Sequence, residues 1–282
     1  MEIARKINAL VLGLVIFLMA SCGKDDPAPN LNPEEGIACA VSQDSVAGGY
    51  SNKYFYNEQG QVTRIERNQY FEPKFETFEY DAGGKLILNK FYSHNNDLLY
   101  QYDEFQYNSS GQVVRINQFT GNPGGALHAD GYTTLAYDVN GKLAERKQFY
   151  PALMASPQTK SVFAYQPDGS IVEKYYNDFL TDGNLSLVYI WEYRFDDKNS
   201  PYLVMPDGLN NYDSVVSLVA FRQRSLFPNN VLSFKEYDPT HTQVKFETNI
   251  SYQYNATGYP VKATYKHQQK LFEVFFNYNC SN

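Results

Sequence analysis

The nine residues from Phe78 to Leu86, FEYDAGGKL, have the pattern of a β-hairpin. Phe78 and Tyr80 are two residues apart, so on a strand they share one face. Asp81 can then accept hydrogen bonds from the backbone of a turn. Gly84 supplies the positive φ that a type I turn followed by a left-handed residue requires, and Leu86 starts the returning strand. The stretch predicts a tight antiparallel hairpin.

The same pattern returns along most of the chain. A tyrosine is followed by glycine four residues later and by an aliphatic residue two further on, and the tyrosines of five full copies are Tyr56, Tyr80, Tyr107, Tyr137 and Tyr165. Three weaker copies follow Phe195, Tyr237 and Tyr254; Asn199 replaces the glycine of the first, and the second has none. The steps between copies are mostly 24 to 30 residues. A steady period of this length indicates one supersecondary unit repeated, not a mosaic of domains.

Aromatic side chains alternate with polar ones on the strands that lead into each turn. Tyr54 and Tyr56, or Phe105 and Tyr107, share one face, whereas Gln106 lies on the other. This alternation predicts strands with one buried aromatic face and one face in water. The returning strands, with sequences such as RIERNQ and AERKQF, are too polar for the lipid-facing band of a transmembrane barrel. The pattern therefore favours a soluble β-domain.

Eight copies of a hairpin predict about 14–16 strands, nearly all of them antiparallel neighbours. An open sheet of this length curls or closes on itself, because its edges promote aggregation. We therefore predict an all-β fold over residues 37–282, an antiparallel up-and-down meander that is closed or nearly closed into a barrel.

One insert, residues 200–233, interrupts the repeat. Asp213 or Ser214 can cap a short helix there. The apolar face of that helix would consist of Val215, Val216, Leu218, Val219 and Phe221. Two placements stay open: the insert plugs the lumen of the barrel, or it packs outside over a sheet edge.

The first 21 residues read as a signal peptide. Arg5 and Lys6 precede a mostly aliphatic run from Ala9 to Ala20, which is the usual order of a secretory signal. As a helix the run would rise only about 18 Å, short of the roughly 30 Å hydrocarbon core of a bilayer. A permanent membrane span is therefore the weaker alternative.

The end of the run resembles the lipobox of bacterial lipoproteins. Leu18-Met19-Ala20-Ser21-Cys22 places two small residues before a cysteine, although that family more often has leucine at the position of Met19. The resemblance implies that Cys22 is acylated and becomes the mature N-terminus, because acyl chains give stable anchoring. An ordinary secretory signal with a free cysteine nearby is the alternative.

The residues after Cys22 resemble the acidic export signal of surface lipoproteins in the Bacteroidota. Lys24, Asp25 and Asp26 follow the cysteine directly, and the resemblance implies transfer to the outer leaflet of the outer membrane, facing the cell exterior. An inward-facing lipoprotein is the alternative. Residues 22–36, which include three prolines, read as a tether.

Two cysteines remain near the ends of the repeat region, Cys39 and Cys280. In an oxidising compartment an even pair predicts a disulfide, and this one would join the two ends of the domain. Two buried free thiols are the alternative. A metal site is the weaker interpretation, because no histidine is nearby in the sequence.

Charge and motifs exclude or weaken several functions. The formal net charge is −7 and there is no basic cluster, so we expect no nucleic-acid partner. The four histidines lie in different repeats without metal-ligand spacing, and they are His94, His128, His241 and His267. No nucleophile elbow, phosphate-binding loop or zinc-protease motif occurs. We expect no metal, no cofactor and no catalytic activity.

The repeats, the SPY triplet at Ser200–Tyr202 and the stretch SLFPNNVLSF from Ser225 resemble an uncharacterised family of Bacteroidota surface lipoproteins. That family has YD-like hairpin repeats and a porin-like fold, and it brings no known activity. The resemblance implies a lipid-anchored protein of the outer membrane, attached to the membrane through its anchor only.

The leading functional prediction is non-catalytic binding of a glycan or a partner protein at the cell envelope. Aromatic rings stack on sugars, and four aromatic residues cluster near the insert: Tyr189, Trp191, Tyr193 and Tyr202. The alternative for these four is that they line the core or the lumen. A scaffold subunit of an outer-membrane complex is the second functional prediction, and a hydrolase is the third.

Overall fold

The structure is a computed structural model, and it describes residues 39–47, 49–68, 73–94, 96–152, 156–180, 182–202, 229–267 and 270–280. These residues belong to the second of two units, which divide between Gly36 and Ile37. The signal peptide, Cys22, the residues Lys24 to Asp26 and the tether lie outside the described residues. The predicted helix of the insert also lies outside them.

The described residues form strands and turns. The strands are β1 (Cys39–Val46), β2 (Tyr50–Tyr56), β3 (Val62–Arg67), β4 (Phe75–Tyr80), β5 (Leu86–Tyr92), β6 (Leu99–Tyr107), β7 (Val113–Thr120), β8 (His128–Tyr137), β9 (Leu143–Phe149), β10 (Thr159–Tyr165), β11 (Ile171–Asn177), β12 (Ser186–Asn199), β13 (Asn229–Tyr237), β14 (Val244–Tyr254), β15 (Pro260–His267) and β16 (Lys270–Cys280). No helix among the described residues is long and apolar enough to cross a membrane.

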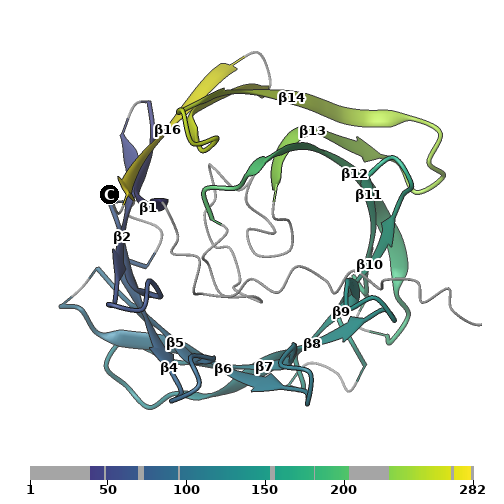
Figure 1. The fold of residues 1–282 in the computed structure, drawn as a ribbon. Coiled ribbons are helices and arrows are strands. Elements are labelled where there is room, and N and C mark those ends of the chain that lie inside the picture. Colours follow the sequence, from purple (N-terminus) through teal and green to yellow (C-terminus); the bar gives the residue numbers. More distant parts are fainter. Residues whose placement is uncertain are drawn as a thin grey trace, which may run out of the picture. The chain divides into compact units, whose positions relative to one another are not determined.

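The strands close into one antiparallel barrel. Each strand pairs with its neighbours in the sequence, and β1 pairs with β16 to complete the ring. Figure 1 shows this closure, with β1 in purple beside β16 in yellow. The prediction of an all-β, closed up-and-down meander is confirmed, with sixteen strands in the part of the chain that the structure describes. Closure leaves no long unpaired edge, which explains why so many strands can form one sheet.

The repeated turn has the predicted chemistry. In the FEYDAGGKL hairpin, the carboxylate of Asp81 accepts hydrogen bonds from the backbone N–H groups of Gly83 and Lys85 at 2.9 and 2.8 Å. Gly84 has a φ of 81°. The corresponding glycine of five other turns has a φ between 76° and 83°; these residues are Gly60, Gly111, Gly141, Gly169 and Gly258. The turn signal read from the sequence is therefore confirmed.

The turns do not all lie at the same end of the barrel. Successive strands run in opposite directions, so turns that are separated by two strands lie at the same end of the barrel. That end, here called the turn end, carries the six glycine turns together with the end of β12 and the start of β13. Only one strand, β14, separates the turn after Tyr237 from the turn after Tyr254. The step between these two tyrosines is 17 residues, in place of the usual 24 to 30. The copy at Tyr237 therefore turns at the opposite end, here called the loop end, and is not equivalent to the others.

The aromatic face of the strands points into the barrel. Tyr202, which follows β12, contacts Asp44 on β1 and Phe276 on β16. Because β12 and β1 are not neighbours in the ring, these contacts cross the interior. Asp44 therefore belongs to the inner wall. Alternation along the paired strands then assigns the buried apolar residues, such as Phe78, to the same wall.

The outer wall carries charges. Neighbouring outward positions form ion pairs such as Lys90 with Glu79, Lys147 with Glu145 and Lys262 with Glu273, and the side chains of these pairs are roughly a quarter to a half exposed. Exposed pairs of this kind contribute little stability, about 0–1 kcal/mol each. Their position matches the polar sequence of the returning strands.

Candidate binding site

Five tyrosines of the repeat, together with Tyr252 and Tyr278, form a ladder along the turn end. Each hydroxyl donates a hydrogen bond to the first, or nearly first, backbone carbonyl of the preceding strand. The seven bonds are Tyr56 to Val41, Tyr80 to Val62, Tyr107 to Leu86, Tyr137 to Val113, Tyr165 to Leu143, Tyr252 to Val231 and Tyr278 to Pro260, with O···O distances of 2.6 to 3.1 Å. Burial raises the pKa of the Tyr165 phenol to about 12, so the hydroxyl stays a donor. The ladder gives these tyrosines a structural role and removes them from the list of ligand contacts.

The tyrosine ladder was not visible in the sequence as a set of bonds. The sequence shows that a tyrosine recurs and that its face is buried, but the acceptor carbonyl lies on the neighbouring strand. The signal that could have found it is the preference for tyrosine over phenylalanine at this one position of the repeat, because only tyrosine can donate a hydrogen bond.

Two of the four aromatic residues near the insert are buried, and their hydroxyl groups form hydrogen bonds inside the barrel. The hydroxyl of Tyr193 donates to Glu173 at 2.8 Å, and that of Tyr202 donates to Asp44 at 2.6 Å. Both rings are at most 3% exposed. Beside Tyr202 is a cavity of about 20 Å³, which is also lined by Tyr252. A cavity of this size can hold one water molecule and is too small for a sugar.

The other two residues form a stacked platform with a third that the sequence did not single out. Trp191 lies 5.4 Å from Tyr175 and 5.5 Å from Tyr189 between ring centroids, with interplanar angles of 26° and 14°. We call Tyr175, Tyr189 and Trp191 the aromatic platform. Tyr175 on β11 pairs directly with Tyr189 on β12, and Tyr193 lies one inward position beyond Trp191. The platform is therefore on the inner wall, toward the loop end.

Solvent reaches Tyr189 most and Tyr175 in part. Tyr189 is 37% exposed, whereas Trp191 is 5% exposed. The indole N–H of Trp191 donates to Glu236 on β13 at 2.8 Å, which fixes the orientation of the ring. The hydroxyl of Tyr175 accepts from Asn177 at 3.3 Å. The arrangement therefore offers one accessible ring on a rigid base, with a carboxylate and an amide nearby.

A belt of polar residues continues from the platform around the inner wall. Its members are each at most 8% exposed and occupy inward positions of β1 to β8, β10, β11 and β14: Asp44, Asn52, Arg67, Glu76, Asn89, Gln101, Asp103, Gln118, Thr133, Ser161, Glu173 and Thr248. Buried polar groups are stable only when neighbours satisfy them. Asp44 illustrates this, because its carboxylate accepts from Asn52 at 2.8 Å and from Tyr54 at 2.6 Å in addition to Tyr202.

The histidines remain separate in the described part of the chain. His94 lies in the turn after β5, His128 begins β8, and His241 lies in the turn after β13. His267 ends β15. Among the described residues no group of three histidine, cysteine, aspartate or glutamate side chains could hold a metal ion.

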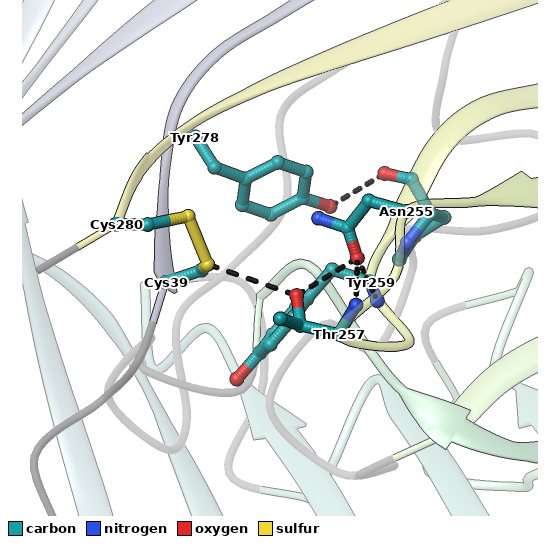
Figure 2. Close-up of a disulfide and its surroundings, with 7 residues drawn as sticks. Cys39, Asn255, Thr257, Tyr259, Tyr278 and Cys280 are labelled. Carbon is teal, nitrogen blue, oxygen red and sulfur yellow. Dashed lines mark hydrogen bonds between the residues drawn. A yellow bond between two sulfur atoms is a disulfide. The ribbon is translucent and has the colours of Figure 1, made fainter. Parts of the chain in front are cut away.

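Cys39 and Cys280 are joined by a disulfide in the structure. They are paired directly in the register of β1 and β16, with Cα atoms 4.0 Å apart. Figure 2 shows the bond at the turn end, beside Thr257 and Tyr278. The Sγ atom of Cys39 is 3.9 Å from the hydroxyl of Thr257, which lies in the turn after β14. The bond therefore lies across the one seam that no chain connection crosses.

Comparison of the coordinates with solved structures identifies the type of barrel. A porin-like protein from Bacteroides uniformis is similar over 85% of this chain and 96% of its own, with a TM-score of 0.55 and 10% sequence identity. The chain has a porin-like fold. At this identity the likeness extends to the fold alone.

Two further similar structures are more distant. A porin-like protein from Bacteroides vulgatus covers 85% of this chain with 98% of its own, at 13% identity and a TM-score of 0.38. A protein of unknown function from Bacteroides fragilis covers 52% of this chain with 89% of its own, at 10% identity and a TM-score of 0.34. No family model matches the sequence, and no curated protein matches it.

Proposed function

We propose that the protein is a lipid-anchored β-barrel of the outer membrane, exposed on the cell surface, that binds a glycan without catalysis. The observation that carries the binding role is the aromatic platform, in which the exposed ring of Tyr189 lies on a rigid base of Tyr175 and Trp191. Aromatic faces provide apolar contact for sugar rings, and neighbouring carboxylates and amides can bond to sugar hydroxyls. A porin-like barrel is compatible with a location in the outer membrane or at the surface.

The absence of catalysis is part of the proposal. Retaining and inverting glycosidases use two carboxyl groups that flank the scissile bond and are available to the substrate. The buried carboxylates of the inner wall are engaged by neighbours instead: Asp44 by Tyr54 and Tyr202, and Glu173 by Tyr193. This engagement favours binding over hydrolysis.

Anchoring is proposed from Ala20-Ser21-Cys22 and exposure from Lys24-Asp25-Asp26. In cells fed a fatty-acid probe, the wild-type protein should be labelled and a Cys22→Ala variant should not. Protease added to intact cells should remove the wild-type protein, and an Asp25→Ala/Asp26→Ala variant should be better protected. Equal labelling of the Cys22→Ala variant contradicts the anchor, and full protection of the wild type contradicts exposure.

A glycan array with the full chain tests the binding role. We expect Tyr189→Ala to reduce binding about fivefold or more, because stacking on an aromatic ring contributes on the order of 1 kcal/mol or more. Tyr102→Ala is the matched control, because Tyr102 is an outer-wall tyrosine that stacks on Phe119. Equal effects of the two substitutions contradict a site at the platform.

A second candidate is a scaffold subunit that contacts other envelope proteins. Phe179 and Leu180, in the loop after β11, are 68% and 80% exposed. The loop is held by Asp178, whose carboxylate accepts from the backbone N–H of Gly183 at 2.7 Å. If no glycan binds and a Phe179→Ser/Leu180→Ser variant loses an envelope partner in pull-downs, the scaffold role replaces the glycan role.

A further inference from the structure

The inner wall between β3 and β6 contains two buried carboxyl groups and one guanidinium. Glu76 on β4 forms an ion pair with Arg67 on β3, and both are at most 8% exposed. The second carboxylate oxygen of Glu76 accepts a hydrogen bond from the side-chain N–H of Asn89 at 3.0 Å. Asp103 on β6 lies beyond Asn89 and is 1% exposed. Glu76 is thus neutralised by a cation, whereas the groups that act on Asp103 in the described part of the chain are Gln101 and Glu76, neither of which is a cation.

Asn89 has an unused acceptor and is the cross-strand partner of Asp103. Its amide N–H bonds to Glu76, but among the described residues no group donates to its Oδ1 atom, although Asn89 is 1% exposed. Asn89 and Asp103 are direct partners in the register of β5 and β6. Direct partners in an antiparallel pair have Cβ atoms about 4.5–5.5 Å apart, within reach of a side-chain hydrogen bond. A buried acceptor without a donor destabilises the folded state, because its lost hydrogen bond to water is not replaced.

We propose that Asp103 is a proton-binding site of the barrel wall, where the protonated carboxyl group donates its O–H to Asn89 Oδ1. One proton then completes a continuous chain of hydrogen bonds from Asp103 through Asn89 and Glu76 to Arg67. Without that proton, two carboxylates share one guanidinium in the interior and Asn89 keeps an unsatisfied oxygen. This proton site is independent of the proposed glycan site.

The surroundings of Asp103 support the protonated form. The group that acts on its charge most directly is the Glu76 carboxylate, which repels a second negative charge. Gln101 donates to Asp103 at 3.3 Å, and Gln118 pairs with it from β7; both are neutral. Burial is the largest cause and raises the pKa of Asp103 to about 7; the hydrogen bond from Gln101 opposes this shift, and the charge of Glu76 adds a smaller increase. Tyr150, which follows β9, also interacts with the charge of Asp103; burial and the Asp130 charge raise the pKa of its phenol, so it is neutral.

The direction of the pH effect follows from the two proton affinities. In the unfolded chain Asp103 titrates near its ordinary value of 3.8, whereas in the barrel it titrates near 7. Between these values the folded state binds a proton that the unfolded state has lost, so the stability of the barrel falls as pH rises through this window. Above pH 7 Asp103 is deprotonated in the folded state as well as in the unfolded state, so this group no longer makes the stability depend on pH.

Thermal unfolding of the full chain in detergent between pH 5 and pH 8 tests the site. We expect the melting temperature of the wild type to fall by roughly 5–10 °C over this range. An Asp103→Asn variant, whose amide can donate to Asn89 Oδ1 at any pH, should lose most of this slope. Glu104→Gln is the matched control, because Glu104 follows Asp103 in the sequence, lies on the outer wall and is not buried. This variant should keep the dependence of the melting temperature on pH that the wild type has.

Infrared spectra of the wild type give a second readout that does not require a variant to fold. At pH 6 a protonated carboxylic acid should give a carbonyl band, which should weaken by pH 9 and shift on aspartate isotope labelling. Absence of this band at pH 6 overturns the proposal. A wild-type pH slope that Asp103→Asn leaves unchanged overturns it as well.

Discussion

The bond between Cys39 and Cys280 has a large expected effect on the stability of the barrel. It joins residues separated by 241 positions, so it removes a very large loop from the unfolded ensemble. In the chain-entropy treatment a loop of this length corresponds to about 5 kcal/mol at 25 °C. A single domain is stable by only about 5–15 kcal/mol. Loss of the bond should therefore remove a third or more of the stability of the barrel.

The perturbation is Cys39→Ser, Cys280→Ser and the double substitution. If the two sulfurs are linked, each single variant should lose about the same stability, and the second substitution should add little to the first. The seam should stay closed in all three, because β1 and β16 keep their backbone ladder from Ala40–Asn279 to Val46–Val274. The expected result is a barrel that folds but unfolds at a much lower concentration of denaturant.

Urea unfolding of the full chain, with and without a reductant, measures the effect. The wild type with reductant should approach the double variant, and the double variant should not respond to reductant. Mass mapping without reduction should yield one linked peptide pair containing both cysteines. Two free thiols in protein recovered from the oxidising envelope, or single-variant losses that add up in the double variant, would refute the reasoning.

Two further predictions concern the repeat. Tyr80→Phe removes the hydroxyl that bonds to the Val62 carbonyl and should lower the free energy of unfolding by about 1–2 kcal/mol, measured by urea unfolding, whereas Tyr102→Phe on the outer wall should cost less than half of that. Gly111→Ala should lower the free energy of unfolding by about 1 kcal/mol, because Gly111 has a φ of 80°. His241→Gly should raise the free energy of unfolding by a similar amount, because His241 has a φ of 59° at the corresponding turn position. Thermal melts that show the same sign for these two substitutions would contradict the shared turn geometry.

The hairpin units could be predicted from the sequence because their information is local. A period of two places aromatic residues such as Phe78 on one face, and a glycine at a fixed offset defines the turn. The direction in which a turn points is not local, since it depends on how many strands precede it. For this reason the copy at Tyr237 resembles the others in sequence and yet lies at the loop end.

The candidate site could be predicted only in part. Tyr189 and Trp191 were singled out by their residue type, but their neighbour Tyr175 comes from another strand. Tyr193 and Tyr202 belong to the same sequence cluster, and the fold uses them to satisfy the buried carboxylates of Glu173 and Asp44.

The sequence by itself determined the repeating unit, the β class, a meander that is closed or nearly closed, and the turn residues, because each of these follows from short-range spacing and from the cost of an exposed sheet edge. The tertiary structure alone decided which polar residues meet. The ladder from Tyr80 to Val62, the pairing of Asn89 with Asp103 and the contact of Tyr202 with Asp44 all join residues on different strands. Their partners are fixed by strand register and by the curvature of the ring, which bring together side chains that no spacing in the sequence connects.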